Sequence, residues 1–402
     1  MHIGFLTFES PFGAKGGGVA SYLRAAIPAL LDAGHRVTLI TANPDGSVPG
    51  GYENRLRVIV VSLPNTHWYL SKLPLAREIV TLPVREAEWS VSFQRTAAQA
   101  MRDDPMDVLE VTELGAWWLA RHPVAPLVVR SHGAEYTFSR YIGAKVSTGS
   151  VWSRHLQRQS LSRAAIVTAP SRNHAAEIAS EMKWNEDRIA VIPNLLSPLM
   201  LRRSADYQPA LSADHSRPVI LYTGRLAPIK GTSLLLDAAA EVIREYPSAQ
   251  FILAGPWQMP VHRREWARWQ ERLGGGDQIL WMDQQSPESL AALYQRATVF
   301  VMPSFYETFG ISCLEAMAFR IPVVATRAGA LPEVVENEEV GLIVAPGDRT
   351  ALSQAILRLL KDPNTRRRMG ANGRERVLTG FDTQTICRQM VRTYEYARER
   401  AA

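Results

Sequence analysis

Two glutamates, Glu307 and Glu315, flank a turn that could hold a ligand with hydroxyls at both ends. The sequence predicts a helix from Gly310, which puts Glu315 about 7–8 Å along the axis on the face of Ile311. A carboxylate on this apolar face needs a partner. The free amides of Phe309, Gly310 and Ile311 favour an anion such as a phosphate. The alternative is a surface Glu307 and a salt-bridged Glu315.

Two cations, Arg225 and Lys230, lie in the loop that follows a predicted strand, Val219 to Thr223. Such a pair can grip a diphosphate and neutralise the charge that grows on a departing nucleotide. The alternative is two solvated surface cations.

In the first half of the chain, His132 follows a predicted strand, Leu127 to Ser131. A histidine at the carboxyl end of a parallel strand is well placed for chemistry, although a lone histidine is more often a satisfied polar residue. Glu113 ends the preceding strand, and Glu135 and Tyr136 follow His132 closely. These three residues could face an acceptor.

A glycine-rich loop, Gly13 to Gly18, separates the first predicted strand from a helix. Its glycines allow the backbone to approach a ligand closely. The loop contains neither G-x-G-x-x-G nor G-x-x-x-x-G-K-[ST], which argues against NAD and ATP sites. The alternative is a flexible surface loop.

The elements that must position these residues are short apolar strands that alternate with helices. This order predicts an α/β protein with doubly wound parallel sheets, whose ligands bind beyond the carboxyl ends of the strands. A chain of 402 residues exceeds one ordinary core, so two domains are expected. The polar, irregular segment from Ser197 to Arg217 predicts the linker between them.

Composition narrows the class of protein. A hydrophobic content of 46% indicates a globular chain, while the net charge of +6 is only weakly informative about anionic partners. Cys313 and Cys387 fall on separate predicted helices and are expected to be free thiols, which suits a reducing cytosol. The sequence contains no signal-peptide pattern and no membrane-length apolar run, so a cytoplasmic location is expected.

Two segments of the first half could contact an acceptor or a membrane. The segment from Leu63 to Met106 is broken by prolines and carries apolar and aromatic residues before a predicted helix, Arg85 to Arg102. The segment from Tyr136 to Ala176 is basic and contains Arg154 and Arg158. The alternatives are packing on the same domain and a solvated helix face.

The run from Glu307 to Glu315, followed by EAMAFRIPVVAT and GALPEVV, resembles the E-x7-E signature of retaining nucleotide-sugar glycosyltransferases of the GT-B fold. This large family includes bacterial mannosyl- and glucosyltransferases and sucrose-synthase-like enzymes. The resemblance implies two doubly wound, Rossmann-like domains that face a central cleft. Residues 1–200 would form the acceptor side and 201–380 the nucleotide-sugar side, with a helix at 381–402 that returns to the first domain. Arg320 departs from the small residue, often glycine, that the family has there.

The resemblance also implies residue roles. Glu307 would hold hydroxyls of the donor sugar and Glu315 the ribose, while the amides of Phe309, Gly310 and Ile311 would contact sugar and phosphate. The family's diphosphate-binding loop is matched by Gly224, Arg225 and Lys230, and its nucleobase contact by Met282. The family's Gly-Gly turn is matched by Gly17 and Gly18, and its histidine near the donor sugar by His132.

The expected reaction transfers a hexose from a UDP- or GDP-sugar to an acceptor hydroxyl with retention of configuration, in glycan, lipopolysaccharide or exopolysaccharide synthesis. The sequence offers no clear nucleophile opposite the donor, which favours attack on the face of the leaving group. No Asp-x-Asp follows a strand, so a metal-independent enzyme with no cofactor besides its nucleotide-sugar substrate is expected.

The expected partners are a nucleotide-sugar donor, a sugar, lipid-linked or small-molecule acceptor, and an anionic membrane surface at the inner face, with no nucleic acid. Two alternatives stay open: a nucleotide-sugar 2-epimerase on the same fold and a non-catalytic nucleotide-sugar-binding protein. An NAD dehydrogenase is disfavoured because the glycine fingerprint is missing.

Overall fold

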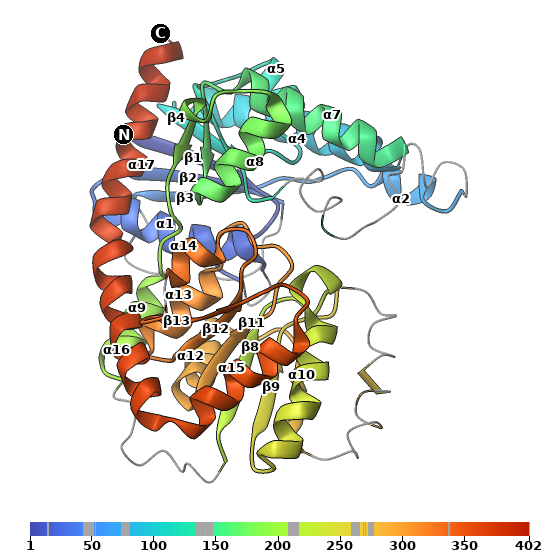
Figure 1. The fold of residues 1–402 in the computed structure, drawn as a ribbon. Helices are drawn as coiled ribbons and strands as arrows, with labels where there is room; N and C mark the ends of the chain where they lie inside the picture. Colours follow the sequence, from blue (N-terminus) through green and yellow to red (C-terminus); the bar gives the residue numbers. More distant parts are fainter. Residues whose placement is uncertain are drawn as a thin grey trace. The chain divides into compact units, whose positions relative to one another are not determined.

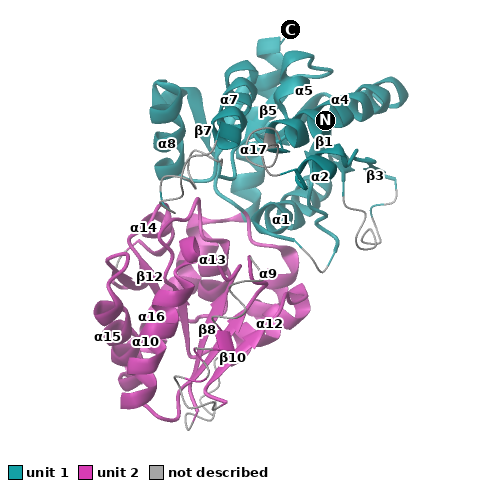
Figure 2. Ribbon diagram, turned by 90° about the vertical axis from the view of Figure 1, so that its right-hand side faces the viewer, with its two compact units in different colours: residues 1–194, 383–402 teal, residues 195–382 magenta. Residues whose placement is uncertain are grey.

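The computed structural model describes residues 1–13, 16–42, 52, 54–73, 81–133, 141, 148–207, 217–258, 266–267, 269, 271, 277–336 and 338–401. The chain divides into two compact units, unit 1 (residues 1–194 and 383–402) and unit 2 (residues 195–382), which Figure 2 distinguishes by colour. The sequence placed the boundaries after residues 200 and 380, whereas the contacts divide the chain after Asn194 and Asp382.

Unit 1 contains a parallel sheet of seven strands in the order β3-β2-β1-β4-β5-β6-β7. The order reverses between β1 and β4, so the carboxyl ends of these neighbouring strands mark the position at which doubly wound sheets bind ligands. The strands are β1 (His2–Thr7), β2 (Arg36–Thr41), β3 (Leu56–Val60), β4 (Val108–Thr112), β5 (Leu127–Arg130), β6 (Ile166–Ala169) and β7 (Ile189–Val191).

Helices cover both faces of this sheet, as right-handed crossovers require. Figure 1 shows α1 (Gly18–Asp32) and α17 (Thr383–Ala401) on one face, with α4 (Thr81–Asp103), α5 (Trp117–Arg121) and α7 (Thr148–Arg163) on the other. The last helix, α17, contacts α1, β4 and β5. The remaining helices are α2 (Thr66–Leu70), α8 (Arg172–Met182) and the short η1 (Glu186–Arg188).

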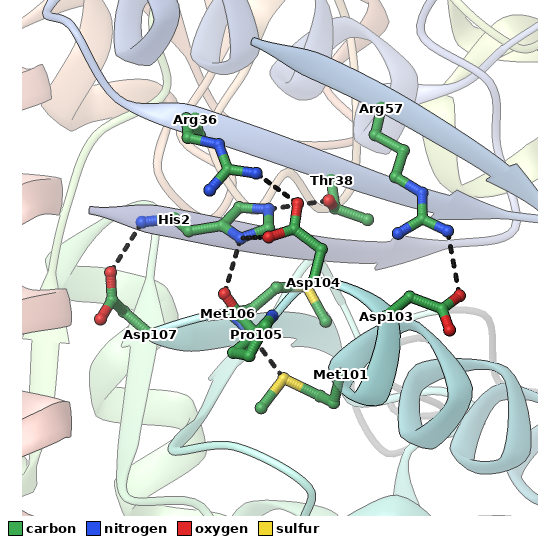
Figure 3. A network of polar contacts seen from close by, with 10 residues as sticks. All are labelled: His2, Arg36, Thr38, Arg57, Met101, Asp103, Asp104, Pro105, Met106 and Asp107. Atoms are coloured by element: carbon green, nitrogen blue, oxygen red, sulfur yellow. Dashed lines mark hydrogen bonds and ion pairs between the residues drawn. The ribbon is translucent and has the colours of Figure 1, made fainter. Parts of the chain in front are cut away.

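The amino ends of the strands are tied by a buried histidine (Figure 3). His2 Nδ1 lies 2.8 Å from the carbonyl oxygen of Pro105, and His2 Nε2 lies 2.8 Å from Thr38 Oγ1. Because a carbonyl only accepts, Nδ1 carries the proton and Nε2 accepts from the threonine hydroxyl. The backbone amide of His2 donates to Asp107 at 2.7 Å. This histidine is therefore a structural residue, at the edge of the sheet opposite to His132.

Unit 2 contains a parallel sheet of six strands in the order β10-β9-β8-β11-β12-β13, with the reversal between β8 and β11. The strands are β8 (Val219–Thr223), β9 (Gln250–Ala254), β10 (Ile279–Met282), β11 (Val299–Met302), β12 (Val323–Thr326) and β13 (Gly341–Val344). The helices whose bounds are described are α9 (Pro198–Ala205), η2 (Pro228–Lys230), α10 (Thr232–Glu245), α12 (Pro287–Arg296), α13 (Ile311–Ala318), α14 (Leu331–Val335), α15 (Arg349–Lys361) and α16 (Pro363–Gly380). The two doubly wound sheets confirm the predicted α/β class.

The structure corrects two predicted segments. The predicted linker begins with a helix, α9, because the Ser197 side chain accepts a hydrogen bond from the Met200 amide and Pro198 suits the first helical position. The helix α4 begins at Thr81 instead of Arg85, because Pro83 falls in the first turn, where no intrahelical amide bond is lost.

Arg320, the residue that departs from the family pattern, has the left-handed backbone conformation that favours glycine, with φ of 57°. Its guanidinium donates to the carbonyl oxygen of Tyr207 at 2.9 Å. Arg320 thus combines a strained backbone with a hydrogen bond to the chain just beyond α9. Both cysteines are free and buried, Cys313 on α13 and Cys387 on α17, as predicted.

Candidate active site

The carboxylate of Glu307 lies at the carboxyl edge of the unit 2 sheet, just after β11. Its Oε1 accepts hydrogen bonds from Lys230 Nζ at 2.7 Å and from Ser304 Oγ at 2.9 Å. The side chain is 10% exposed. Its Oε2 has no hydrogen-bond partner among the residues that the structure describes. One oxygen is therefore fixed by the protein, and the other can accept from a ligand.

The backbone of Glu307 is held by the loop that follows β12. The amide of Ala330 donates to the carbonyl oxygen of Glu307 at 2.9 Å. Gly329 has φ of 55°, and a Cβ there would lie 2.1 Å from the same oxygen. Only glycine fits both constraints. The two strand ends, β11 and β12, thus position the carboxylate together.

The start of α13 presents backbone donors next to Glu307. Gly310 has φ of 100°, a conformation that turns the chain into the helix at Ile311. Within the described ranges, the amides of Phe309, Gly310 and Ile311 donate no hydrogen bond. The phenyl ring of Phe309 is buried and packs edge-on against Phe381 at 5.7 Å. These amides can bind an anion at the positive end of the helix.

Glu315 lies on α13 and is half-buried. The Tyr294 hydroxyl donates to its Oε2 at 2.8 Å. A tyrosine of α12, 21 positions earlier, is therefore one partner of this carboxylate.

The two predicted cations behave differently. Gly231, directly after Lys230, packs so closely that a Cβ would lie 2.0 Å from the Pro303 carbonyl oxygen. This contact brings the loop to the end of β11 and Lys230 to Glu307. Arg225 is exposed, and its side chain makes no hydrogen bond or ion pair within the described part of the chain. Its backbone carbonyl accepts from the Tyr222 hydroxyl at 2.7 Å.

Two further candidate residues lie at neighbouring strand ends. Gly224 has φ of 146°, and a Cβ on Gly255 would lie 2.0 Å from the Gly224 carbonyl oxygen. Met282 ends β10, and its carbonyl oxygen accepts from the Gly255 amide at 2.9 Å. The backbone is thus linked across the carboxyl ends of three neighbouring strands, β8, β9 and β10.

In unit 1, Glu113 braces the turn that carries His132. Its carboxylate accepts from Ser131 Oγ at 3.0 Å, from the His132 amide at 3.2 Å and from the Gly133 amide at 3.1 Å. Burial raises the pKa of this carboxyl, and the amide and hydroxyl donors oppose that rise. Glu113 therefore acts on the protein backbone through both oxygens, in addition to any role toward an acceptor.

The environment of His132 favours a neutral imidazole. Burial lowers the pKa of His132 well below its ordinary value. The nearby Arg130 cation and His174 lower this pKa further. The ring of Tyr22 lies 5.2 Å from the imidazole, centroid to centroid. A neutral imidazole has one donor nitrogen and one acceptor nitrogen, so His132 can exchange hydrogen bonds with sugar hydroxyls.

The glycine turn before α1 holds a protein carboxylate. Glu9 Oε2 accepts from the amides of Gly17 and Ala20, each at 2.8 Å. A Cβ on Gly17 would lie 2.8 Å from Glu9 Oε1, whereas one on Gly18 would meet nothing within 4 Å. Glu9 was not among the predicted site residues, although its place two residues beyond β1 is a signal that could have pointed to it. The match of Gly17 and Gly18 to the family's Gly-Gly turn, and with it their contact with the donor, stays a prediction.

The remaining candidates are only partly placed. Glu135 and Tyr136 lie outside the described residues. Arg154 pairs with Glu181 of α8, and Arg158 lies 3.6 Å from the same carboxylate. Glu181 lies just beyond the predicted basic segment, Tyr136 to Ala176. Part of the positive charge of that segment is therefore neutralised locally.

Two kinds of feature are absent from the described residues. No helix there has both the length and the hydropathy needed to cross a membrane. No group of three or more His, Cys, Asp or Glu side chains there is arranged to hold a metal ion.

Two family models match the chain. Glycosyltransferase Family 4 matches residues 16–198, and Glycosyl transferases group 1 matches residues 204–376. A D-inositol 3-phosphate glycosyltransferase of Corynebacterium efficiens is 29% identical over 258 residues, which span 62% of this chain and 61% of that protein. An MMP alpha-(1->4)-mannosyltransferase of Mycolicibacterium hassiacum is 29% identical over 436 residues, and the match covers 100% of both chains.

Solved structures show the same fold. Sucrose-phosphate synthase from Thermosynechococcus elongatus superimposes with a TM-score of 0.76 and 25% identity, over 98% of each chain. Anabaena HepE in complex with UDP-glucose has a TM-score of 0.74 and 20% identity, over 98% of this chain and 99% of that one. With both halves matched, the chain belongs to the glycosyltransferases of the GT-B fold.

Proposed function

We propose that this protein transfers a hexose from a UDP- or GDP-sugar to an acceptor hydroxyl, with retention of configuration and without a metal. The observation that carries the proposal is the Lys230–Glu307 pair at the start of α13, where a cation, a carboxylate and free amides share one strand edge. The matched relatives act on inositol phosphate or transfer mannose by name, and HepE was solved with UDP-glucose.

In the proposed mechanism, the donor diphosphate binds Arg225, Lys230 and the amides at the start of α13. Glu307 Oε2 accepts a hydrogen bond from a hydroxyl of the donor sugar. The acceptor hydroxyl attacks the anomeric carbon on the side of the leaving phosphate. The bond between that carbon and the phosphate oxygen breaks, its electron pair stays on the phosphate, and the acceptor's proton moves to the same phosphate. The cations and amides stabilise the charge that develops.

In this mechanism, neutral His132 forms hydrogen bonds with the donor sugar and holds it. A neutral imidazole suits this task because it adds no positive charge next to a sugar ring that becomes cationic. Its low pKa supports this state across the neutral pH range.

The test is a thermal-shift screen of UDP, GDP and ADP and their sugars, with wild type, Lys230→Ala and Glu307→Gln. Lys361→Ala is the matched control, because Lys361 forms an exposed ion pair with Glu245 on the same unit. We expect one nucleotide to raise the melting temperature of wild type and the control, and far less that of Lys230→Ala. If no nucleotide at millimolar concentration stabilises wild type, the proposal fails.

Product analysis then separates the alternatives. Transfer with an unchanged anomeric configuration supports the retaining enzyme. Interconversion of the nucleotide sugar without acceptor would identify an epimerase instead. Binding with no turnover in any acceptor trial would identify a binding protein. Activity that survives a chelator supports metal independence.

We also propose that unit 1 associates with anionic membrane surfaces. Trp68 and Tyr69 of α2 are 47% and 66% exposed, and Trp152 of α7 is 51% exposed. The ammonium of Lys72 lies 3.6 Å from the centroid of the Trp68 ring. Exposed aromatics beside a cation suit a headgroup region. Flotation with anionic vesicles at low salt, compared between wild type and Trp68→Ala, tests this point, and equal binding by both would contradict it.

A further inference from the structure

Three side chains in unit 2 form one buried hydrogen-bond chain that ends at Glu315. Tyr294 OH lies 2.8 Å from Glu315 Oε2 and 2.8 Å from Thr223 Oγ1. An ionised carboxylate only accepts, and its contact at 2.8 Å is much shorter than the 3.4 Å contact of the same hydroxyl with the Ser312 carbonyl oxygen, so the single tyrosine proton points to Glu315. The threonine hydroxyl must then donate to the tyrosine oxygen. The chain therefore runs in one direction, from Thr223 through Tyr294 to the carboxylate.

The tyrosine and the threonine of this chain are buried. Tyr294 is fully buried and Thr223 is 3% exposed. The Tyr294 ring stacks on Phe319 at 5.6 Å, with 17° between the planes, and contacts Phe300 at 5.9 Å. Hydrogen bonds in such surroundings are stronger than in water and polarise one another. Burial raises the pKa of the Tyr294 hydroxyl well above its ordinary value, and the charge of Glu315 adds to the rise, so the tyrosine stays protonated.

We propose that Tyr294, supported by Thr223, is a positioning residue that fixes the Glu315 carboxylate in the orientation in which it receives a ribose hydroxyl. This inference rests on the proposed donor site. A glutamate on a helix has several rotamers, and ordering them would otherwise cost binding free energy. The interior hydrogen bond removes that freedom before the donor arrives.

The same chain connects the ribose contact to the diphosphate loop. Thr223 is the last residue of β8, and the loop with Arg225 and Lys230 follows it directly. The two ends of a bound nucleoside diphosphate would therefore rest on one hydrogen-bonded support. Sequence reasoning could not find this link, because Thr223 and Tyr294 are 71 positions apart.

The test measures discrimination between ribose and deoxyribose. The probes are UDP, GDP and ADP and their 2′-deoxy and 3′-deoxy forms, titrated by calorimetry against wild type, Tyr294→Phe and Glu315→Gln. We expect wild type to prefer the ribose form of its nucleotide by about tenfold. Tyr294→Phe keeps the ring and loses the hydroxyl, so this preference should fall below about threefold while affinity for the deoxy form hardly changes.

Tyr394→Phe is the matched control. It removes a hydroxyl from another buried tyrosine that donates to a buried glutamate at 2.7 Å, in unit 1. Tyr394→Phe should keep the wild-type preference for ribose, even if its melting temperature falls. A loss of this preference in both Tyr294→Phe and Tyr394→Phe would indicate a general structural effect.

The outcomes separate this inference from the function on which it rests. If wild type binds none of the nucleotides, the proposed donor site fails, and the inference fails with it. If wild type binds a nucleotide and Tyr294→Phe keeps the full ribose preference, the positioning role is overturned while the donor site stands. The same holds if wild type binds a nucleotide but shows no preference for its ribose form. If Tyr294→Phe does not fold, Thr223→Val decides. It removes only the donor to Tyr294 and should still reduce the preference at least about twofold.

Discussion

The buried carboxylate of Glu110 anchors α17, the last helix of the chain. Removing the Tyr394 hydroxyl should show how much this contact contributes to the free energy of unfolding. Tyr394 of α17 donates to Glu110 Oε2 at 2.7 Å, and Tyr22 donates to Oε1 at 2.7 Å. Glu110 is 4% exposed. At pH 7.5 Tyr394→Phe removes a hydrogen bond to a charged group, so the free energy of unfolding should fall by about 2 kcal/mol. For a unit of this size that corresponds to about 4–8 °C in Tm.

The loss should depend on pH in a defined direction. Burial raises the pKa of Glu110, while Arg130 and the two tyrosine hydroxyls oppose the rise. A carboxyl with a raised pKa binds protons more tightly in the folded state, so its cost to stability appears as pH rises from the unfolded pKa through the folded pKa. Tyr394→Phe raises the folded pKa further. The variant should therefore lose more stability at pH 7.5 than at pH 4, where only a neutral bond of about 1 kcal/mol is lost.

Differential scanning calorimetry at both pH values measures this effect. Tyr396→Phe is the control, because Tyr396 lies on the same helix and is 53% exposed. The reasoning is refuted if Tyr394→Phe stays within about 0.5 kcal/mol of the control at pH 7.5, the range of ordinary surface substitutions. A loss that grows toward acid pH would refute the electrostatic part alone.

Substitutions at three further positions test the fold of the two units. Arg320→Ala keeps the left-handed strain and loses the bond to Tyr207, so Arg320→Gly should be more stable than Arg320→Ala by about 1 kcal/mol in urea unfolding. An equal pair would show that the backbone carries no strain. Gly329→Ala places a Cβ 2.1 Å from the Glu307 carbonyl oxygen, so nucleotide-induced thermal shifts should be lost, and an unchanged shift would contradict that clash. Glu9→Ala removes the acceptor for two amides at the start of α1 and should cost about 1–2 kcal/mol, measured by urea unfolding, and Glu9→Gln should recover part of this.

The sequence was sufficient for the strands and for the position of the helix that carries Glu315, because short apolar runs and a glycine before a helix are local signals. It was not sufficient for the partners of these glutamates. Ser304 is near in sequence, but nothing local shows that its hydroxyl points to Glu307, and Tyr294 belongs to another helix.

Two other features were not predictable for similar reasons. The backbone contacts of Glu113 have no local signal, since a strand-end carboxylate facing a ligand and one facing backbone amides look alike in sequence. The helix α9 was missed because its Ser197–Pro198 start lies in a polar stretch, where the overall composition outweighed the capping signal.

The return of α17 to unit 1 has a consequence for synthesis. A ribosome releases residues 1–194 first, but the unit they belong to is finished only when Thr383–Ala401 follows. Until then Glu110 lacks one of its two hydroxyl donors, and the faces of α1 and β4 that α17 covers are open to water. Unit 2 is one continuous stretch and has no such delay. The nascent chain thus completes its second unit before its first, and a truncation of the last twenty residues would damage the part made earliest.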